Sequence, residues 1–292
     1  MRVFILGFMN SHIYEETTAM QLARDANFFF KRGLVRSDDY SKDDVLIRFG
    51  DCSYASYDKL FGRVINNARA IRHNCNKLHT HMSLWNNGFR VPKPFLTDKE
   101  IEETDLPIMR REVRHSRASD IKLITSMNNF IEGNFYTEFI PNDVEYRFHI
   151  MFNQCLRISK KVPKKEAERI SDYIRSSTTG WTLEDSFKHN IGIENQAIKE
   201  CIKAVSFLGL DFGACDVVIS KDNLPYLLEV NTCPRLGQYG RQVYAKEFLT
   251  QLELPMEDIN LSKVKEFEFA DTLMMKYRKA MKHKPSLQDF KL

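Results

Sequence analysis

GLDFGACDVVISKDNLPYLLEVNTCPRLG, residues 209–237, is the segment from which we infer the fold. Two segments in it, residues 214–220 and 226–230, are rich in residues that suit a pleated, half-buried surface. The polar residues between them suit a short turn. The stretch therefore predicts two antiparallel strands joined as a hairpin.

The register of this hairpin decides where its acidic residues lie. We place Ser220 opposite Pro225 across a four-residue loop. Asp216 then falls directly opposite Glu229, and Asn231 shares the face of Glu229, because side chains repeat every second residue. Facing carboxylates repel each other unless a cation lies between them, and a set of carboxylate and amide oxygens suits Mg²⁺. The alternative is a surface hairpin with scattered polar residues.

DFGACDVV followed by YLLEVNTCP closely resembles the final metal-binding hairpin of the ATP-grasp ligases. That superfamily includes D-alanine–D-alanine ligase and the enzymes that add glutamate to the C-terminus of a ribosomal protein. The resemblance implies that Asp216, Glu229 and Asn231 hold the Mg²⁺ of Mg-ATP, with Mn²⁺ as a possible substitute. It also implies a fold of α/β plus α+β class, in which a small N-terminal α/β domain precedes two α+β lobes that clamp the nucleotide.

Composition is that of an ordinary globular protein: 292 residues, 43% hydrophobic, 28% charged and a net charge of +4. This modest charge could favour an anionic small molecule such as a nucleotide, but it does not by itself indicate a nucleic-acid partner. The six cysteines show no C-x-x-C pair, which suits reduced thiols in a cytoplasm. The apolar opening MRVFILGF is too short to span a membrane, so we expect a buried strand and a cytoplasmic protein.

Residues 1–65 alternate a strand (3–8), a helix (15–32) and a second strand (44–49), a rhythm that predicts a small parallel sheet. By resemblance, the ATP-grasp domain occupies residues 66–250. We divide it into a lobe with the flap, about residues 90–135, and a catalytic lobe, about residues 136–250. Residues 251–292 are expected to form a helical extension.

Residues 66–84 carry a helical apolar stripe, and Lys77 lies within it. The pattern N-K-x-x-T-x-x-x-L-x-x-x-G-x-x-V-P, which starts at Asn76, resembles the ATP-grasp entry helix, whose lysine reaches the nucleotide phosphates. The alternative for Lys77 is a solvated surface charge.

Residues 106–120 are rich in arginine and precede the expected flap. ATP-grasp proteins usually read P-x-x-x-K here, and this chain has Arg111 at the lysine position, which keeps the phosphate-binding charge. Ala118 and Ser119 replace the expected flap glycines, so Ser116 would contribute its hydroxyl instead. The alternative is a basic surface loop for an acidic partner.

Residues 145–152 alternate apolar and polar side chains, the pattern of a half-buried strand. If Asn153 and Gln154 form a two-residue turn, Arg147 faces Lys160 across the hairpin. Neighbouring cations are destabilising unless an anion lies between them, which predicts that this pair binds a phosphate or a substrate carboxylate.

The resemblance assigns the adenine pocket to the segment TEFI. Backbone groups of Glu138, Phe139 and Ile140 would read the purine edge, and Glu145 would hold the ribose hydroxyls. On composition alone Phe139 is a core residue. Residues 164–185 read as an exposed helix and a polar turn, and residues 194–208 as an amphipathic helix that ends at Gly209.

Arg235 follows the metal-binding hairpin, where many ATP-grasp proteins carry glycine. The loop borders the acceptor site, so Arg235 could contact an acidic substrate, or it could be an exposed charge.

The resemblance implies an ATP-dependent carboxylate–amine ligase. A carboxylate attacks the γ-phosphate of ATP to give an acyl phosphate, and an amine then displaces phosphate. The substrates would be small-molecule or peptide acids and amines, and the enzyme could be a homodimer. Two alternatives stay open: a kinase of the same fold, and a nucleotide-binding interaction protein without turnover, which Arg111 and the missing flap glycines favour.

Overall fold

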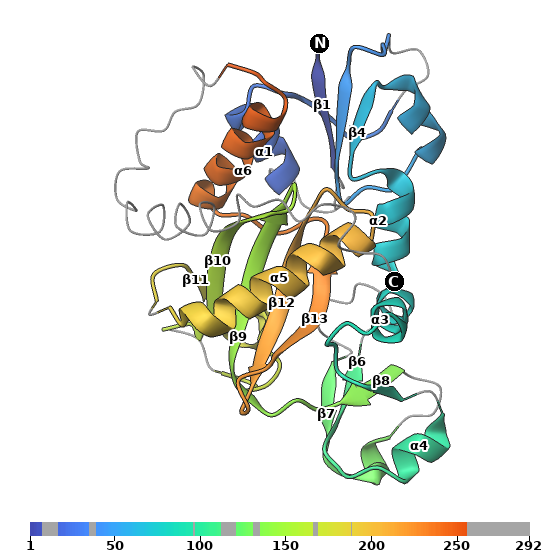
Figure 1. The fold of residues 1–292 in the computed structure, drawn as a ribbon, viewed down its shortest axis with the longest axis vertical. Helices are drawn as coiled ribbons and strands as arrows, with labels where there is room; N and C mark the ends of the chain where they lie inside the picture. The colour runs from blue at the N-terminus through green and yellow to red at the C-terminus, as the bar shows by residue number, and fades with distance from the viewer. Residues whose placement is uncertain are drawn as a thin grey trace.

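The computed structural model describes residues 1–7, 17–34, 39–95, 97–111, 121–130, 135–165, 169–187 and 189–255. Their strands form three sheets that follow one another from top to bottom in Figure 1. In these ranges no helix is both long and apolar enough to cross a membrane.

The N-terminal sheet is parallel throughout, as the sequence predicts, in the order β2-β1-β3-β4. Its strands are β1 (Val3–Gly7), β2 (Phe29–Lys31), β3 (Val45–Phe49) and β4 (Arg63–Ile65). The helix predicted for residues 15–32 is shorter, because α1 (Thr18–Asp25) ends before Asn27, which takes a left-handed conformation with φ 55°. The 3₁₀ helix η1 (Ala55–Leu60) links β3 to β4.

The single helical segment expected at residues 66–84 is two helices, α2 (Ala68–Cys75) and α3 (Lys77–Asn86). Asn76 breaks them apart: its ψ of 93° is not helical, and its side chain accepts a hydrogen bond from the His79 backbone as the N-cap of α3. This break places Lys77 at the first residue of α3.

A small antiparallel sheet in the order β5-β8-β6-β7 follows. It contains β5 (Pro94–Phe95), β6 (Ile108–Arg111), β7 (Lys122–Ile124) and β8 (Phe135–Glu138), with α4 (Asp98–Glu102) and the 3₁₀ helix η2 (Met127–Asn129). Residues 112–120, which include Ser116, Ala118 and Ser119, lie outside the described residues.

The central sheet is antiparallel, in the order β11-β10-β9-β12-β13. Its strands are β9 (Asn142–Met151), β10 (Gln154–Pro163), β11 (Trp181–Glu184), β12 (Phe212–Ser220) and β13 (Pro225–Asn231). The long helix α5 (Ile191–Phe207) lies across one face, where it buries alternate strand residues such as Phe148 and Val217 (Figure 1). The predicted helix is confirmed, including its end at Gly209, which has φ 69°.

The opposite face of the central sheet is covered at one end by α6 (Gln238–Gln251), which also packs beside α1. The exposed helix expected in residues 164–185 is not seen in residues 169–185, which hold η3 (Ser177–Thr179) and β11. Most of the expected C-terminal extension, residues 256–292, lies outside the described residues. The rest of this second face carries charged side chains, and these form the candidate site.

Candidate active site

Asp216 and Glu229 lie directly opposite each other on β12 and β13, so the predicted pairing is confirmed. The register next to the turn differs from the prediction, because Ile219 and not Ser220 pairs with Pro225. A bulge at Leu228 adds one residue to β13 and restores the register. The bulge thus keeps both carboxylates on the face that α5 leaves open.

Asn231 completes this group. Its side-chain nitrogen donates to Oε1 of Glu229 over 2.8 Å, which leaves the amide oxygen as the atom for a cation. No group of three or more His, Cys, Asp and Glu side chains placed to hold a metal occurs among the described residues. The set here has two carboxylates and an amide, all oxygen donors, which fits a hard cation such as Mg²⁺ that completes its shell with water and phosphate.

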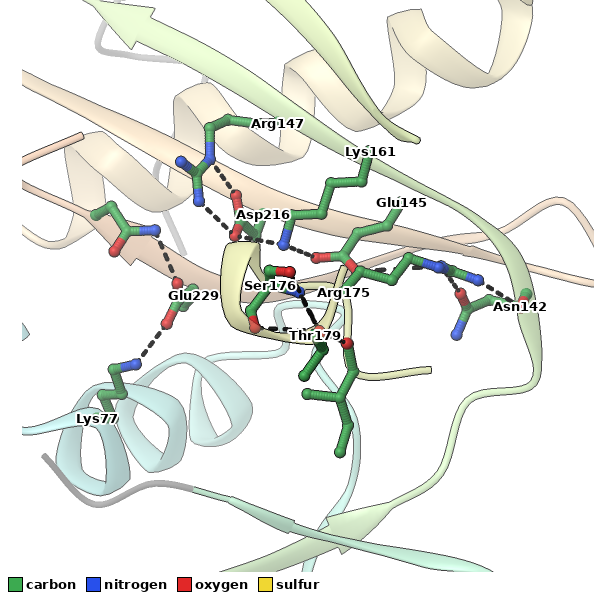
Figure 2. Close-up of polar contacts among 12 residues, drawn as sticks. Lys77, Asn142, Glu145, Arg147, Lys161, Arg175, Ser176, Thr179, Asp216 and Glu229 are labelled. Carbon is green, nitrogen blue, oxygen red and sulfur yellow. Dashed lines mark hydrogen bonds and ion pairs between the residues drawn. The ribbon is translucent and has the colours of Figure 1, made fainter. Parts of the chain in front are cut away.

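Arg147 and Lys161 surround Asp216, whose exposure is only 2%. Arg147 donates from Nε over 2.6 Å and from Nη2 over 2.8 Å, and Lys161 donates over 3.1 Å (Figure 2). Burial alone would raise the pKa of Asp216, but these two cations hold it well below its usual value. Asp216 is therefore ionised at neutral pH, as a metal ligand must be.

Lys77 makes the matching contact with Glu229, Nζ to Oε2 at 2.7 Å (Figure 2). Burial opposes ionisation of Glu229, and the attraction of Lys77 outweighs it, so the pKa of Glu229 is lowered. The start of α3 thus brings a lysine from a distant part of the chain to Glu229.

Lys161 also bonds Glu145, which is 3% exposed, and Figure 2 shows the resulting chain of charges from Asp216 to Arg175. Burial raises the pKa of Glu145 despite the nearby lysine. Arg175, itself buried, donates to the side chain and backbone carbonyl of Asn142. These contacts therefore link Asp216 to Asn142, at the start of β9.

The prediction that Arg147 faces Lys160 is wrong. The turn of the β9–β10 hairpin lies at Phe152 and Asn153, both with positive φ, and a register shift follows between Cys155 and Arg157. Ser159 consequently faces Arg147, and Lys160 faces Tyr146 on the side of the sheet covered by α5.

Lys161, and not the predicted Lys160, lies near Arg147, because both bind Asp216. The sequence does not distinguish these two adjacent lysines. The turn position and the register shift decide which of them lies on the open face, and neither has a clear sequence signature. Arg175 was missed as well, because it comes from an irregular segment far along the chain.

Residues 138–140, which are expected to hold adenine, already make contacts with other residues of the protein. The Glu138 side chain accepts from the Lys93 backbone over 2.8 Å, and the Ile140 carbonyl accepts from Asn142 over 2.7 Å. Phe139 makes an edge-on contact with Tyr173, with ring centroids 4.9 Å apart. A carbonyl has two lone pairs, so the Ile140 carbonyl can accept a further bond from a ligand.

Arg111, at the end of β6, donates to the Thr137 hydroxyl over 2.9 Å. Burial lowers the pKa of Arg111 to about 10, against the opposing attraction of Glu145 and Glu229, so it remains a cation at neutral pH. The structure thus brings Arg111 to the charged cluster. Arg235 is exposed on the loop between β13 and α6, and Ser116 lies outside the described residues.

No known family model and no curated protein matches the chain. Solved structures do match it. D-alanine–D-alanine ligase from Bacillus anthracis complexed with ATP is 13% identical, with a TM-score of 0.60 over 96% of this chain and 98% of that one. The ATP-grasp ligase PsnB complexed with a minimal precursor, Mg and ADP is 10% identical, with a TM-score of 0.59 over 86% and 98%.

A third match is N5-carboxyaminoimidazole ribonucleotide synthetase from Thermotoga maritima, 13% identical, with a TM-score of 0.61 over 87% of this chain and 76% of that one. The identities to all three are low, so what they share with this chain is the fold. The resemblance read from the two hairpins is confirmed at that level: the chain has the fold of the ATP-grasp ligases.

Proposed function

We propose that the chain is an Mg-ATP-dependent ligase that activates a carboxylate and joins it to an amine. The observation that carries the proposal is the pair Asp216 and Glu229, ionised and facing each other on an ATP-grasp fold. Cations of the protein lie beside both carboxylates and keep them ionised, and two ionised carboxylates with an amide are the oxygen donors that Mg²⁺ takes.

Nucleotide binding would use residues of the small sheet and of the open face of the central sheet. We assign the purine to the backbone at residues 138–140 and the ribose to Glu145. The phosphates are assigned to Arg111, Lys161 and Ser116. Mg²⁺, or Mn²⁺ in its place, would be held by Asp216, Glu229 and Asn231, and would supply neutralisation of the phosphate charge.

The cations of the site would then change partners. Arg147 and Lys161 neutralise Asp216, and Lys77 neutralises Glu229. When phosphate oxygens arrive, these side chains are already placed to turn to them, which is positioning with little reorganisation.

In the first step an oxygen of the substrate carboxylate attacks the γ-phosphorus, and the bond to the ADP oxygen breaks. In the second, the amine nitrogen attacks the acyl carbon, phosphate leaves with the mixed-anhydride oxygen, and the nitrogen loses its extra protons to give the amide. Arg111, Arg147 and Lys161 would stabilise the charge that spreads over the transferring phosphoryl group. Arg235 would contact an acidic acceptor. We further propose the domain boundaries 1–65, 66–250 and 251–292.

The test is a trap for the acyl phosphate. The full chain is incubated with Mg-ATP and pools of small acids or peptides, with and without hydroxylamine, which converts an acyl phosphate to a hydroxamate. We expect ADP, phosphate and hydroxamate in equal amounts for an accepted acid. ADP with a phosphorylated alcohol and no free phosphate would contradict the ligase and identify a kinase.

A further inference from the structure

Two cysteines from different segments of the chain meet outside the candidate site. Cys52 lies in the loop after β3 of the N-terminal sheet, and Cys75 is the last residue of α2. Both are free thiols, partly buried, and packed against the core between α5 and the central sheet. The Cys75 side chain lies within hydrogen-bonding reach of the Cys52 side chain. Arg72, which shares a face of α2 with Cys75, donates to the Cys52 carbonyl over 3.3 Å, so the backbones also lie side by side.

Buried contacts of Arg48 hold the two segments in this arrangement. Arg48 has no exposed surface, and its Nη1 donates to the carbonyls of the two residues that flank Cys52, over 3.0 and 2.8 Å. Its Nε donates to Asp58 over 2.7 Å, and the second oxygen of that carboxylate accepts from the first backbone N–H of α2 over 3.0 Å. The same arginine thus fixes the backbone at Cys52 and the start of the helix that carries Cys75.

A second pair of neighbouring thiols provides a comparison. Cys201 on α5 and Cys215 on β12 lie in the core, and neither is more than 1% exposed. Burial raises the pKa of Cys201 well above its ordinary value. A thiol reacts as its thiolate and has to be reached by the oxidant, so we expect this pair to stay reduced. Burial also raises the pKa of Cys75, but Cys52 and Cys75 are both partly exposed, so of these two pairs theirs is the one that a dissolved oxidant can reach.

We propose that Cys52 and Cys75 form a reversible disulfide with a small-molecule disulfide, such as oxidised glutathione, as the oxidant. One cysteine attacks the reagent as its thiolate, which forms a mixed disulfide and releases one small thiol. The sulfur of the other cysteine then displaces the second small thiol. Two S–H bonds of the protein are replaced by one S–S bond, and the two electrons and two protons pass to the reagent, which becomes two thiols.

This crosslink joins the N-terminal sheet to the end of α2. It closes a loop of about 24 residues, which restricts the unfolded chain and so stabilises the fold. The end of α2 is already held to the central sheet, because Asn74 donates to the Val230 carbonyl over 2.7 Å. The disulfide therefore fixes the N-terminal sheet to a helix that contacts the central sheet. None of the residues assigned to the nucleotide or the metal takes part, so the inference does not depend on the proposed function.

The test is a map of the disulfides in the full chain. The protein is incubated in an excess of oxidised or reduced glutathione, free thiols are blocked with N-ethylmaleimide, and peptides prepared without a reductant are analysed by mass spectrometry. We expect a crosslink between Cys52 and Cys75 in oxidised glutathione only, with Cys201 and Cys215 blocked as free thiols once the chain is unfolded. The crosslinked chain should melt about 5 °C higher than the reduced chain.

Two serine variants decide whether these cysteines are the pair. Cys52→Ser should lose both the crosslink and the melting shift. Cys233→Ser removes an exposed cysteine close to Cys75 and should keep both. A wild-type chain that crosslinks Cys75 to Cys233 would overturn the proposal. Glutathione attached to Cys52 or Cys75 without a crosslink, or reaction at Cys233 alone, would overturn it as well.

Discussion

Arg147 binds Asp216 with two hydrogen bonds, of 2.6 and 2.8 Å, from the neighbouring position across β9 and β12. Both side chains are largely buried, at 15% and 3% exposure. The carboxylate assigned to the metal is therefore already neutralised by the protein itself. A metal ion and Arg147 have to share or compete for the same oxygens, and this relationship can be tested.

Replacing Arg147 by Gln should destabilise the protein by about 3 kcal/mol without metal, because the buried Asp216 keeps only Lys161 as a partner. Mg²⁺ should restore part of that loss by taking the place of the lost cation. Urea unfolding with and without Mg²⁺ measures the loss of stability and its recovery. The control is Arg69→Gln, because Arg69 is exposed. An equal loss in both conditions would contradict the metal assignment.

Lys161→Met and Lys160→Met form a matched pair on adjacent residues. Lys161 bonds Glu145 and Asp216, whereas Lys160 lies on the other face of the sheet. We expect Lys161→Met to weaken ATP binding at least tenfold and Lys160→Met to change it less than twofold, measured by calorimetric titration. The reverse order would show that the register of the β9–β10 hairpin is different in solution.

His81 should make stability fall in mild acid. Burial lowers its pKa from 6.5 to about 4, so the unfolded chain takes up a proton that the folded chain refuses. The contribution of His81 is fully present above pH 6.5 and is lost as pH falls toward 4, by about 2 kcal/mol at pH 5. His81→Gln keeps a donor for the Pro92 carbonyl and should flatten this dependence. The free energy of unfolding is measured in urea between pH 7 and 4.5. The same pH dependence in His81→Gln as in the wild type would contradict a buried, neutral His81.

Gly50 marks the contact between the N-terminal sheet and the loop after β13. Its φ is 78°, and an added Cβ would lie 2.4 Å from Cβ of Cys233. Gly88 has a similar φ of 75° but nothing within 4 Å, so it is the control. Gly50→Ala should cost about 1–2 kcal/mol more than Gly88→Ala in urea unfolding. Equal losses would show that the close approach is absent.

The most reliable predictions from the sequence concerned the hairpin of residues 212–231. Strand composition and period-two alternation put Asp216 and Glu229 together, although the assumed loop pairing was off by one residue. The prediction succeeded because the bulge at Leu228 compensated for that error. The parallel N-terminal sheet and α5 were also predicted, since each depends on local periodicity and on a short connection.

The predictions that failed depended on backbone conformations, which the pattern of apolar and polar side chains does not determine. Asn76 has a non-helical ψ, and Phe152 and Asn153 have positive φ. The sequence alone does not predict these backbone conformations. Partners brought together from distant segments, such as Arg175 with Asn142, require the complete fold. The site was therefore predicted where it lies within one hairpin, and missed where several segments converge.

Calorimetric titration with a non-hydrolysable ATP analogue, in Mg²⁺ or in EDTA, measures whether nucleotide binding requires the metal ion assigned to Asp216 and Glu229. Wild type is compared with Glu229→Gln, which keeps the shape but not the charge of the metal ligand, and with the edge-strand variant Glu184→Gln as control. We expect binding that requires Mg²⁺, weakens at least tenfold in Glu229→Gln and is unchanged in Glu184→Gln. Binding that is equally strong in EDTA, or no binding by the wild type, would contradict this expectation.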